Sequence, residues 1–387
     1  MHIQSNPTKI YTHWPGLLLQ ICLMMLLGCT DNTESNDREE ILENDILISE
    51  EDGRLNKLEN ALQIVPANPF EDIDAHAREC PDALAVNVAT LSSYLKSRST
   101  TDLEKARAIY IWLTDNVSYD DDAFNSGGYG DYSPEGLLSS RKAVCEGFSN
   151  LYLALGEEMG LNIRKVSGYA KGFGYAPGRK FERSNHAWNV IEIDGQWKII
   201  DATWGQGNGT AVNGKLVSKK EFDPYWFDVD PYEAIFNHFP EDTQFTFVSP
   251  NISLDQYQRF PFVDKSYFEY GFDGKQMYET SLFDPQIELP KCFHVATYAR
   301  VINAPEFGVL EKGQSYTFEW FVPEGKKMAL IDNENEWTFF EKENRIFSLH
   351  YIPVTIGNLK VSVQHEESNN SFGTLLIYQV RSEKESI

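Results

Sequence analysis

The sequence predicts an α+β fold followed by a β-sandwich, and three patterns carry this prediction. Apolar residues recur at helical period from Thr101 to Val117 and again from Cys145 to Gly160. The dipeptide Asp194-Gly195 is a hairpin signal between two strand-like segments. From about Phe293 onward, short alternating runs divided by turn residues are typical of an immunoglobulin-like (Ig-like) sandwich.

Length and charge limit the classes of function. The chain has 387 residues, which is too long for one average domain and suits two. Its hydrophobic fraction of 42% is enough for a buried core over most of that length. The net charge of -24 argues against nucleic acid as a partner, because phosphate contacts require clustered lysine and arginine.

Residues 1–28 have the pattern of a lipoprotein signal peptide. The apolar run from Leu17 to Leu27 is short for a membrane span but suits the apolar region of such a peptide. The run ends in Gly28-Cys29, which resembles the lipobox of bacterial lipoproteins. We therefore expect a lipid on Cys29 that anchors the chain to the membrane without a spanning helix. The alternative is an ordinary signal peptide with an incidental cysteine.

This interpretation predicts a membrane-anchored lipoprotein of the bacterial cell envelope, either periplasmic or exposed on the surface. Residues 29–64 are acidic and poor in aromatic residues, so we expect a flexible tether there. The predicted boundaries after the tether are an α+β domain over residues 65–250, a connecting segment over residues 251–290 and the β-sandwich over residues 291–387.

Three cysteines remain once Cys22 is removed with the signal peptide and Cys29 is lipidated. They are Cys80, Cys145 and Cys292, and an odd number in an exported protein suggests at least one free thiol. The sequence leaves open whether Cys80 and Cys292 pair.

The first helix is expected from Thr101 to Val117, because Thr101 and Glu104 have the spacing of a capping box. A loop rich in glycine and serine is expected over Phe124–Gly136. The second helix should begin at or just before Cys145 and end at Gly160. Strands are expected next, over Ile163–Ala170, His186–Ile193 and Gln196–Ala202.

The hairpin turn fixes a register between the last two strands. With the turn centred on Asp194-Gly195, Trp188 lies opposite Asp201. His186 shares the face of Trp188, so His186 and Asp201 are diagonal neighbours at about 7–8 Å between Cα atoms. A hydrogen bond between imidazole and carboxylate can bridge that distance. The aspartate at the end of a hydrophobic strand is therefore predicted to face the histidine.

Cys145 supplies the residue type that would complete a reactive group. The unpaired N–H groups and the dipole at a helix start favour a thiolate, and an adjacent His186 would favour it further. Asp201 would fix the tautomer of His186, and the backbone N–H of Cys145 would serve an oxyanion. Each residue alone also has a structural reading, as core filling, a satisfied core histidine or a turn residue. Their order and the hairpin favour acyl transfer by a cysteine nucleophile.

Four segments resemble the transglutaminase-like superfamily, and in particular its kyphoscoliosis peptidase branch: "AVCEGFSNLYLALGEEMGL", "SGYAKG", "NHAWNVIEIDGQWKIIDATWG" and "FNHFPED". The resemblance covers about Leu103 to Phe247 and implies a papain-like transglutaminase core over the predicted catalytic domain. It also implies that Cys145, His186 and Asp201 are the catalytic triad.

The resemblance implies an enzyme but leaves its reaction open. We expect a cell-surface cysteine acyl-transfer enzyme that acts on protein or peptide amides, with a peptidase or amide hydrolase preferred. Hydrolysis is preferred because neither a calcium loop nor a dedicated amine site is recognisable. A protein-glutamine transglutaminase is one alternative. A non-catalytic surface protein, whose sandwich binds a protein or glycan partner, is the other.

Several further residues are assigned around the triad. Trp188 and Trp204 are expected to keep it dry, or to line the acyl pocket. Candidates for a second oxyanion donor are Asn116, Tyr119 and Tyr132, because no glutamine shortly precedes Cys145.

No metal and no cofactor are expected, because the scattered histidines lack zinc-ligand spacing and no EF-hand loop is present. The glycine-rich stretch Gly172–Gly178 is interpreted as a flap over the cleft or as a plain surface loop. His238, in the aromatic-rich segment Pro224–Asp242, is interpreted as structural.

Overall fold

The computed structural model describes residues 68–128, 130–295, 298–364 and 371–382. The chain divides into two compact units, Met1–Leu62 and Gln63–Ile387, and all described residues belong to the second unit. The predicted signal peptide, Cys29 and the whole predicted tether lie outside the described residues. No helix in the described part of the chain is both long and apolar enough to cross a membrane.

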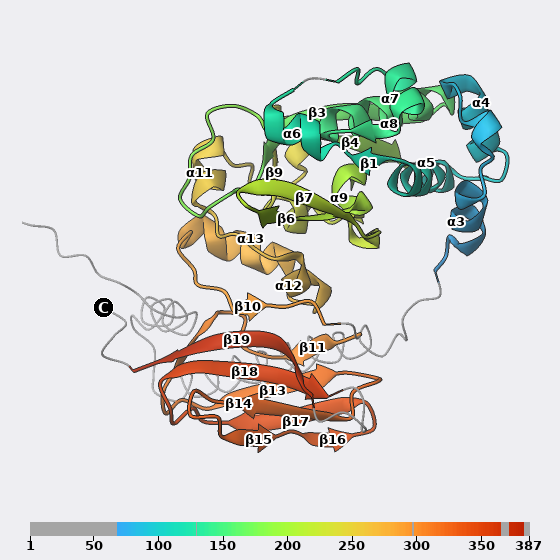
Figure 1. The fold of residues 1–387 in the computed structure, drawn as a ribbon. Helices are drawn as coiled ribbons and strands as arrows, with labels where there is room; N and C mark the ends of the chain where they lie inside the picture. Colours follow the sequence, from blue (N-terminus) through green and yellow to red (C-terminus); the bar gives the residue numbers. More distant parts are fainter. Residues whose placement is uncertain (1–67, 129, 296–297, 365–370, 383–387) are drawn as a thin grey trace, which may run out of the picture. The chain divides into compact units, whose positions relative to one another are not determined.

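Helices form the first part of the described chain (Figure 1). Their bounds are α3 Glu71–Arg78, η1 Asp82–Leu84, α4 Val88–Lys96, α5 Asp102–Asn116, α6 Asp121–Ser126, α7 Pro134–Ser140 and α8 Cys145–Glu158. The predicted capping box is present in α5, where Thr101 accepts from Glu104 N and the Glu104 side chain accepts from Thr101 N. The predicted starts and ends of α5 and α8 are confirmed to within two residues.

A five-stranded sheet follows, in the order β8-β5-β4-β3-β9. Its strands are β3 Asn162–Ala170, β4 His186–Ile193, β5 Gln196–Ile200, β8 Phe227–Val229 and β9 His238–Pro240. The predicted hairpin register is confirmed, with Ile193 opposite Gln196 and Asn189 opposite Ile200. Asp194 and Gly195 both have positive φ, which is what a two-residue turn of this kind requires.

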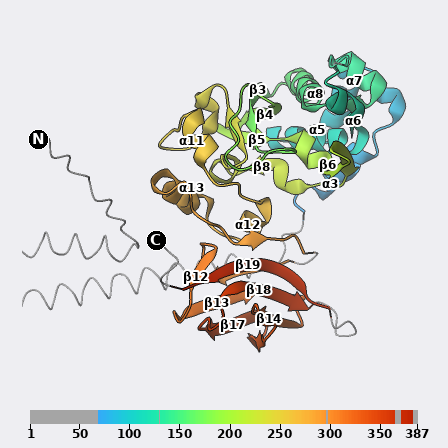
Figure 2. The same cartoon turned by 60° about the vertical axis from the view of Figure 1, so that its left-hand side comes forward.

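Helix α8 packs on β3 and β4, and α5 packs on α8. Figure 2 shows β3, β4 and β5 running between α5 and α8 on one side and α11 on the other. The remaining short elements of this region are β1 Ser118–Tyr119, β2 Lys142–Ala143, α9 Ala202–Gln206, β6 Gly207–Val212, β7 Lys215–Lys220, η2 Pro224–Trp226, α10 Pro231–Ala234 and η3 Thr243–Thr246.

Three helices and two sheets form the rest of the described chain. The helices are α11 Leu254–Arg259, α12 Lys265–Glu269 and α13 Gly274–Phe283. One sheet contains β10 Lys291–Cys292, β12 Val309–Glu311, β14 Lys327–Ile331, β15 Trp337–Phe339, β18 Gly357–Gln364 and β19 Gly373–Arg381. The other contains β11 Arg300–Asn303, β13 Tyr316–Phe321, β16 Glu341–Glu343 and β17 Ile346–Tyr351. Apolar residues of both sheets share one buried cluster, so the predicted α+β fold with a C-terminal β region is confirmed.

Two sequence-based expectations about local structure are wrong. The expected loop Phe124–Gly136 is helical at both ends, because Asp120 caps α6 and Ser133 caps α7 with Pro134 in its first turn. The third expected strand ends at Ile200 rather than Ala202. It ends there because Asp201 turns the chain into α9.

Candidate active site

Asp201 occupies the junction between strand β5 and helix α9. Its Oδ1 atom accepts hydrogen bonds from the backbone N–H groups of Thr203 at 2.8 Å and Trp204 at 3.0 Å. This is the geometry of a helix N-cap, so the carboxylate satisfies two N–H groups that have no partner within the helix. The second oxygen, Oδ2, remains available for other side chains.

His186 begins β4 and meets that second oxygen. Its Nε2 atom lies 2.7 Å from Oδ2 of Asp201. Both side chains are buried, with 7% and 1% of their surfaces exposed. The contact that the hairpin register predicted is therefore present, although Asp201 has already left the strand.

Cys145 is the first residue of α8, and its side chain lies close enough to His186 to help raise the pKa of that imidazole. Because Nε2 of His186 is hydrogen-bonded to Asp201, Nδ1 is the ring nitrogen that remains available to the sulfur of Cys145. Helix α8 packs against β4, so the helix start is held beside the strand that carries the histidine. The structure thus brings together all three residues of the predicted triad.

The charges of the group reinforce one another. Burial alone would lower the pKa of His186, but the charge of Asp201 and hydrogen bonds with Asp201 and Cys145 raise it to about 10. Burial would raise the pKa of Asp201, and the two histidines that contact it hold it well below its usual range. The imidazole is therefore protonated at neutral pH, and it lies beside the side chain of Cys145.

The predicted flanking tryptophans lie around the histidine. The ring centroid of Trp188 is 6.0 Å from that of His186, and that of Trp204 is 5.5 Å away. Trp188 is almost completely buried. A Cβ added at Gly168 would come within 2.4 Å of the Trp188 ring, so this glycine makes room for the indole. Both indoles restrict access of water to the imidazole, as expected.

The candidate oxyanion donors differ in where the structure places them. The amide of Asn116 donates to the carbonyl of Trp112 in its own helix, so it is engaged there. The hydroxyl of Tyr132 is buried and has no hydrogen-bond partner among the described residues. The carbonyl of Tyr132 accepts from Asn150 of α8, which ties this loop to the helix of Cys145. Tyr119 pairs with Ala143 between strands β1 and β2, and it is near enough to Cys145 for their charges to interact. Burial raises the pKa of Tyr119 strongly, so its hydroxyl stays protonated.

His238, interpreted from the sequence as structural, makes a contact that the sequence does not reveal. Its Nε2 atom lies 3.0 Å from Oδ2 of Asp201, the same oxygen that contacts His186. The residue is 37 positions from Asp201 and lies on β9, which pairs with the far side of β3. The segment "FNHFPED" carries His238, but no spacing in the sequence relates this segment to the hairpin.

His186, Asp201 and His238 offer two ring nitrogens and a carboxylate oxygen within 4.8 Å of one another. Zinc accepts donors of these types, and no sequence spacing reveals this set because its members come from three separate segments. Both ring nitrogens lie at hydrogen-bonding distance from the same carboxylate oxygen. These hydrogen bonds account for the close approach of the three side chains.

The other thiols of the described chain are separate from this site. Cys80 and Cys292 are both free, so they do not form the disulfide that the sequence left open. Burial raises the pKa of each thiol, which makes both of them poor nucleophiles at neutral pH.

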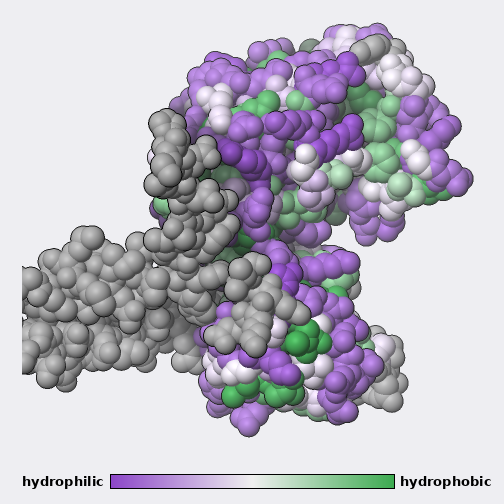
Figure 3. Space-filling model, turned by 90° about the vertical axis from the view of Figure 1, so that its left-hand side faces the viewer, coloured by the Kyte–Doolittle hydropathy of each residue, from purple (hydrophilic) through white to green (hydrophobic). Residues whose placement is uncertain are grey.

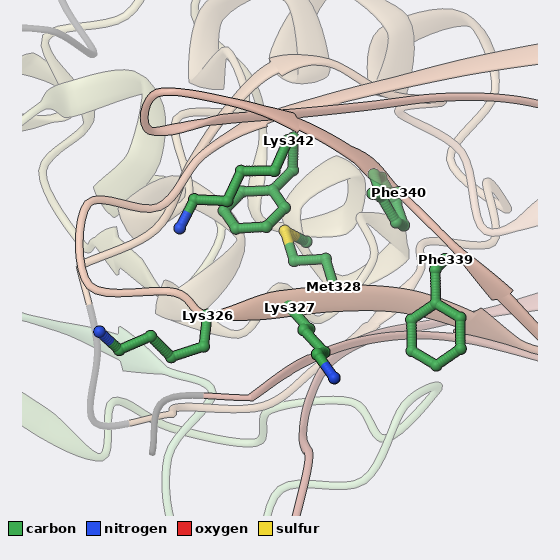
Figure 4. Close-up of a pocket in the computed structure, with 7 residues that line it drawn as sticks. Lys326, Lys327, Met328, Phe339, Phe340 and Lys342 are labelled. Atoms are coloured by element: carbon green, nitrogen blue, oxygen red, sulfur yellow. The ribbon is translucent and has the colours of Figure 1, made fainter. Parts of the chain in front are cut away.

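A shallow pocket of about 290 Å³ lies in the β-sandwich rather than at the triad. Figure 4 shows Met328, Phe339 and Phe340 in it, with the side chains of Lys326, Lys327 and Lys342 around them. None of the residues that line it is a cysteine or histidine. Figure 3 shows a mainly hydrophilic surface on the visible face of the described residues, with small hydrophobic groups between.

Comparisons with known proteins find similarity over the part of the chain that carries these residues. Residues 89–202 match the model of the transglutaminase-like superfamily. The chain is 30% identical over 313 residues to kyphoscoliosis peptidase of Mus musculus, which covers 81% of this chain and 43% of that protein. It is 32% identical over 218 residues to hillarin of Drosophila melanogaster, covering 52% of this chain and 26% of that protein. The chain thus spans less than half the length of these curated relatives.

A solved structure described as a TGase is also similar, with 19% identity, a TM-score of 0.24 and coverage of 51% of this chain and 44% of that one. The superfamily match includes Cys145, His186 and Asp201, and it ends before His238.

Proposed function

We propose that this chain, whose residues 89–202 match the transglutaminase-like superfamily, is a cysteine acyl-transfer enzyme that hydrolyses amides of proteins or peptides. The observation that carries the proposal is the 2.7 Å contact between His186 and Asp201, together with the side chain of Cys145 beside the same imidazole. A nucleophile, a base and a residue that orients the base are what acyl transfer through a covalent intermediate requires.

In the first step, the Cys145 sulfur attacks the amide carbonyl carbon and forms a C–S bond. The backbone N–H of Cys145, at the start of α8, stabilises the oxyanion that develops on the carbonyl oxygen. The His186 imidazolium then gives its proton to the amide nitrogen, so the C–N bond breaks and the amine leaves. The products of this step are a thioester on Cys145 and a neutral His186.

In the second step, His186 takes a proton from water while the water oxygen attacks the thioester carbonyl. The C–S bond breaks, the sulfur leaves as a thiolate, and the acid is released. If an amine replaces water, the same sequence of bonds yields a new amide and the enzyme is a transglutaminase. The similarity to a relative named as a peptidase favours water as the acceptor.

A labelling experiment tests the nucleophile. A variant in which Cys22, Cys29, Cys80 and Cys292 are all serine keeps Cys145 as the only thiol in the sequence. We expect iodoacetamide at neutral pH to label this variant rapidly, and Cys145→Ala in the same background to remove that labelling while circular dichroism stays unchanged. Equal labelling of the two folded proteins would rule out Cys145 as the nucleophile and favour a non-catalytic surface protein.

The acceptor is tested separately. The protein is incubated with peptide and protein amides, with and without a primary amine such as dansylcadaverine. Hydrolysis predicts that released acid accumulates and that added amine changes the products little. Incorporation of the amine as the main product would instead identify a transglutaminase.

The proposed location is the bacterial cell envelope, with a lipid on Cys29. The support is the apolar run that ends in Gly28-Cys29. We expect the full chain expressed in bacteria to partition with membranes, and Cys29→Ala to prevent processing and incorporation of labelled palmitate. Palmitate labelling of the Cys29→Ala variant would contradict this assignment.

The proposed role of the sandwich is to bind a surface protein or a glycan. Its support is the exposed aromatic pair Trp337 and Phe339 on β15, which are 44% and 53% exposed. The double variant Trp337→Ala, Phe339→Ala should lose retention on cell-surface material while the labelling of Cys145 is kept. Unchanged retention would remove this surface as the partner site.

A further inference from the structure

Asp201 accepts four hydrogen bonds, and two of them come from histidines. Oδ1 receives the backbone N–H groups of Thr203 and Trp204, and Oδ2 receives Nε2 of His186 at 2.7 Å and Nε2 of His238 at 3.0 Å. The usual orienting carboxylate serves one imidazole. The second imidazole has no part in the acyl-transfer steps described above, and its position requires an explanation.

The sheet places both histidines on the same carboxylate. In the pairing of β3 with β4, His186 lies opposite Gly168, and in the pairing of β3 with β9, His238 lies opposite Ala170. Gly168 and Ala170 are two residues apart, so the two histidines lie on the same face of the sheet with β3 between them. Gly168 carries no side chain, and the Trp188 ring fills the space that a Cβ at this position would need.

The environment of His238 keeps its ring neutral. Burial lowers the pKa of His238, and the charge of His186 lowers it further, against the opposing effect of Asp201. The residue is 4% exposed, and the rings of Trp188, Trp204 and Trp226 lie with centroids 5.1, 4.4 and 5.3 Å from its own. A neutral ring that faces a carboxylate through Nε2 must carry its proton there. Nδ1 is then unprotonated, and it has no hydrogen-bond partner among the described residues.

We infer that His238 is a positioning residue, which holds the Asp201 carboxylate through a hydrogen bond from Nε2 and thereby limits how tightly Asp201 retains the proton of His186. A neutral donor spreads the charge of the carboxylate without competing for its proton. The inference rests on the proposed function, because His186 must release its proton to the leaving amine. An acid transfers a proton best when its affinity for that proton is matched to the working pH.

The charged and titratable groups that face this cluster come from three further elements. They are Cys145 of α8, Tyr110 of α5 and Tyr119 of β1. The two tyrosines have strongly raised pKa values because they are buried, so they stay neutral over the range in which His186 titrates. Besides His186, His238 is the side chain that contacts Oδ2 of Asp201 among the described residues.

The test follows the titration of His186 by NMR in protein labelled with ¹⁵N histidine. His238→Phe removes the donor and keeps a planar ring, and His238→Gln keeps an N–H donor near the position of Nε2. We expect the midpoint of His186 to rise by about one pH unit in His238→Phe and to stay near the wild-type value in His238→Gln. Trp226→Phe is the matched control, because it changes a neighbouring ring of His238 without removing a hydrogen bond to Oδ2.

Kinetics on a peptide amide give the second reading. If proton release by His186 is hindered, kcat falls in His238→Phe while KM is little changed, and His238→Gln restores kcat. A role in packing alone would lower stability in His238→Phe and in His238→Gln, and it would leave the titration midpoint of His186 in place. A midpoint in His238→Phe that is unchanged or lower than in the wild type overturns the inference.

The wild-type protein supplies a measurement that does not depend on a variant folding. Its ¹⁵N spectrum should show His238 protonated at Nε2 and unprotonated at Nδ1 throughout pH 7 to 10. A cationic ring, or a proton on Nδ1, would contradict the donor role. If Cys145→Ala retained full activity, the proposed function would fail while these spectra stayed the same, so the two failures are distinguishable.

Discussion

Nε2 of His186 and Oδ2 of Asp201 lie 2.7 Å apart, with His186 at the start of strand β4 and Asp201 directly after strand β5 of the same hairpin. His238 of β9 contacts the same oxygen at 3.0 Å, so a strand outside the hairpin also meets this ion pair. The pair raises the pKa of the imidazole, so its integrity should affect how fast Cys145 reacts with an alkylating agent.

Asp201→Asn should remove the negative charge beside His186 and keep the hydrogen bonds that cap helix α9. An amide oxygen can still accept from Thr203 and Trp204, so helix α9 stays capped, but the stabilisation of the His186 cation is lost. We expect the rate of Cys145 alkylation at pH 6 to fall by about tenfold or more, because an opposite charge shifts a titration by about 1–3 units. The measurement is the alkylation rate against pH in the background whose only thiol is Cys145. A curve that coincides with the wild type would contradict the ion pair.

His186 should also affect stability in a pH-dependent way. Its pKa is raised to about 10 in the folded chain, against about 6.5 in an unfolded one. Its contribution is therefore complete below about pH 6.5 and disappears as the pH rises through 10. The difference in unfolding free energy between the wild type and His186→Gln, measured in urea, should shrink across this range. A difference that is constant with pH would refute the assignment.

Lys171 should act in the opposite direction. The lysine is buried, its Nζ donates to the carbonyls of Phe260 and Pro261, and burial lowers its pKa to about 7. Between about pH 7 and 10.4 the unfolded chain holds a proton that the folded chain has released, so stability rises with pH over this window.

Lys171→Met removes that titration and keeps the length of the side chain. We expect the stability of the wild type relative to Lys171→Met to increase from pH 7 to pH 10, as measured by urea unfolding. The lost hydrogen bonds add an offset that does not vary with pH. A relative stability that falls over this range would contradict the lowered pKa.

The buried pair of Asp74 and Arg107 should be costly to break on one side only. Arg107 donates through two nitrogens to the two carboxylate oxygens at 2.8 Å, and the two side chains are 3% and 5% exposed. Asp74→Ala leaves a buried guanidinium without its partner, which costs about 3–5 kcal/mol. Replacing both residues with Leu and Met should recover most of that loss.

The matched control is the exposed pair Arg78 and Asp115, whose side chains are 42% and 30% exposed. Arg78→Ala should cost about 0–1 kcal/mol. Urea unfolding of the single variants and the double variant measures all of these values. Equal costs for Asp74→Ala and Arg78→Ala would show that burial does not determine the strength of the pair.

The sequence alone was sufficient for the parts of the site that depend on local geometry. The register follows from Asp194-Gly195, since a two-residue turn fixes which residues are opposite. The helix start at Cys145 follows from the apolar period of the segment. These two features place Cys145, His186 and Asp201 on elements whose relative directions are set by short-range rules.

The parts that the sequence could not supply depend on long-range pairing. His238 reaches Asp201 only because β9 pairs with β3, and no turn or period relates those strands. Asp201 was expected in a strand, but its carboxylate competes with the sheet for the backbone and caps α9 instead. Likewise, the polar residues between Phe124 and Gly136 are typical of a loop. The structure shows instead that polar side chains cap helices here, with Asp120 at the start of α6 and Ser133 at the start of α7.

The two carboxylate oxygens of Asp201 make different hydrogen bonds. Oδ1 accepts from the start of helix α9, and Oδ2 contacts the two imidazoles. A related chain without catalytic activity would still be stabilised by Asp201, because losing this residue would leave two backbone N–H groups of α9 without hydrogen-bond partners. An aspartate at this position in another sequence therefore indicates that the fold is kept, and it does not indicate that the protein is catalytically active. Under the proposed function, Cys145 is the position whose loss would end acyl transfer.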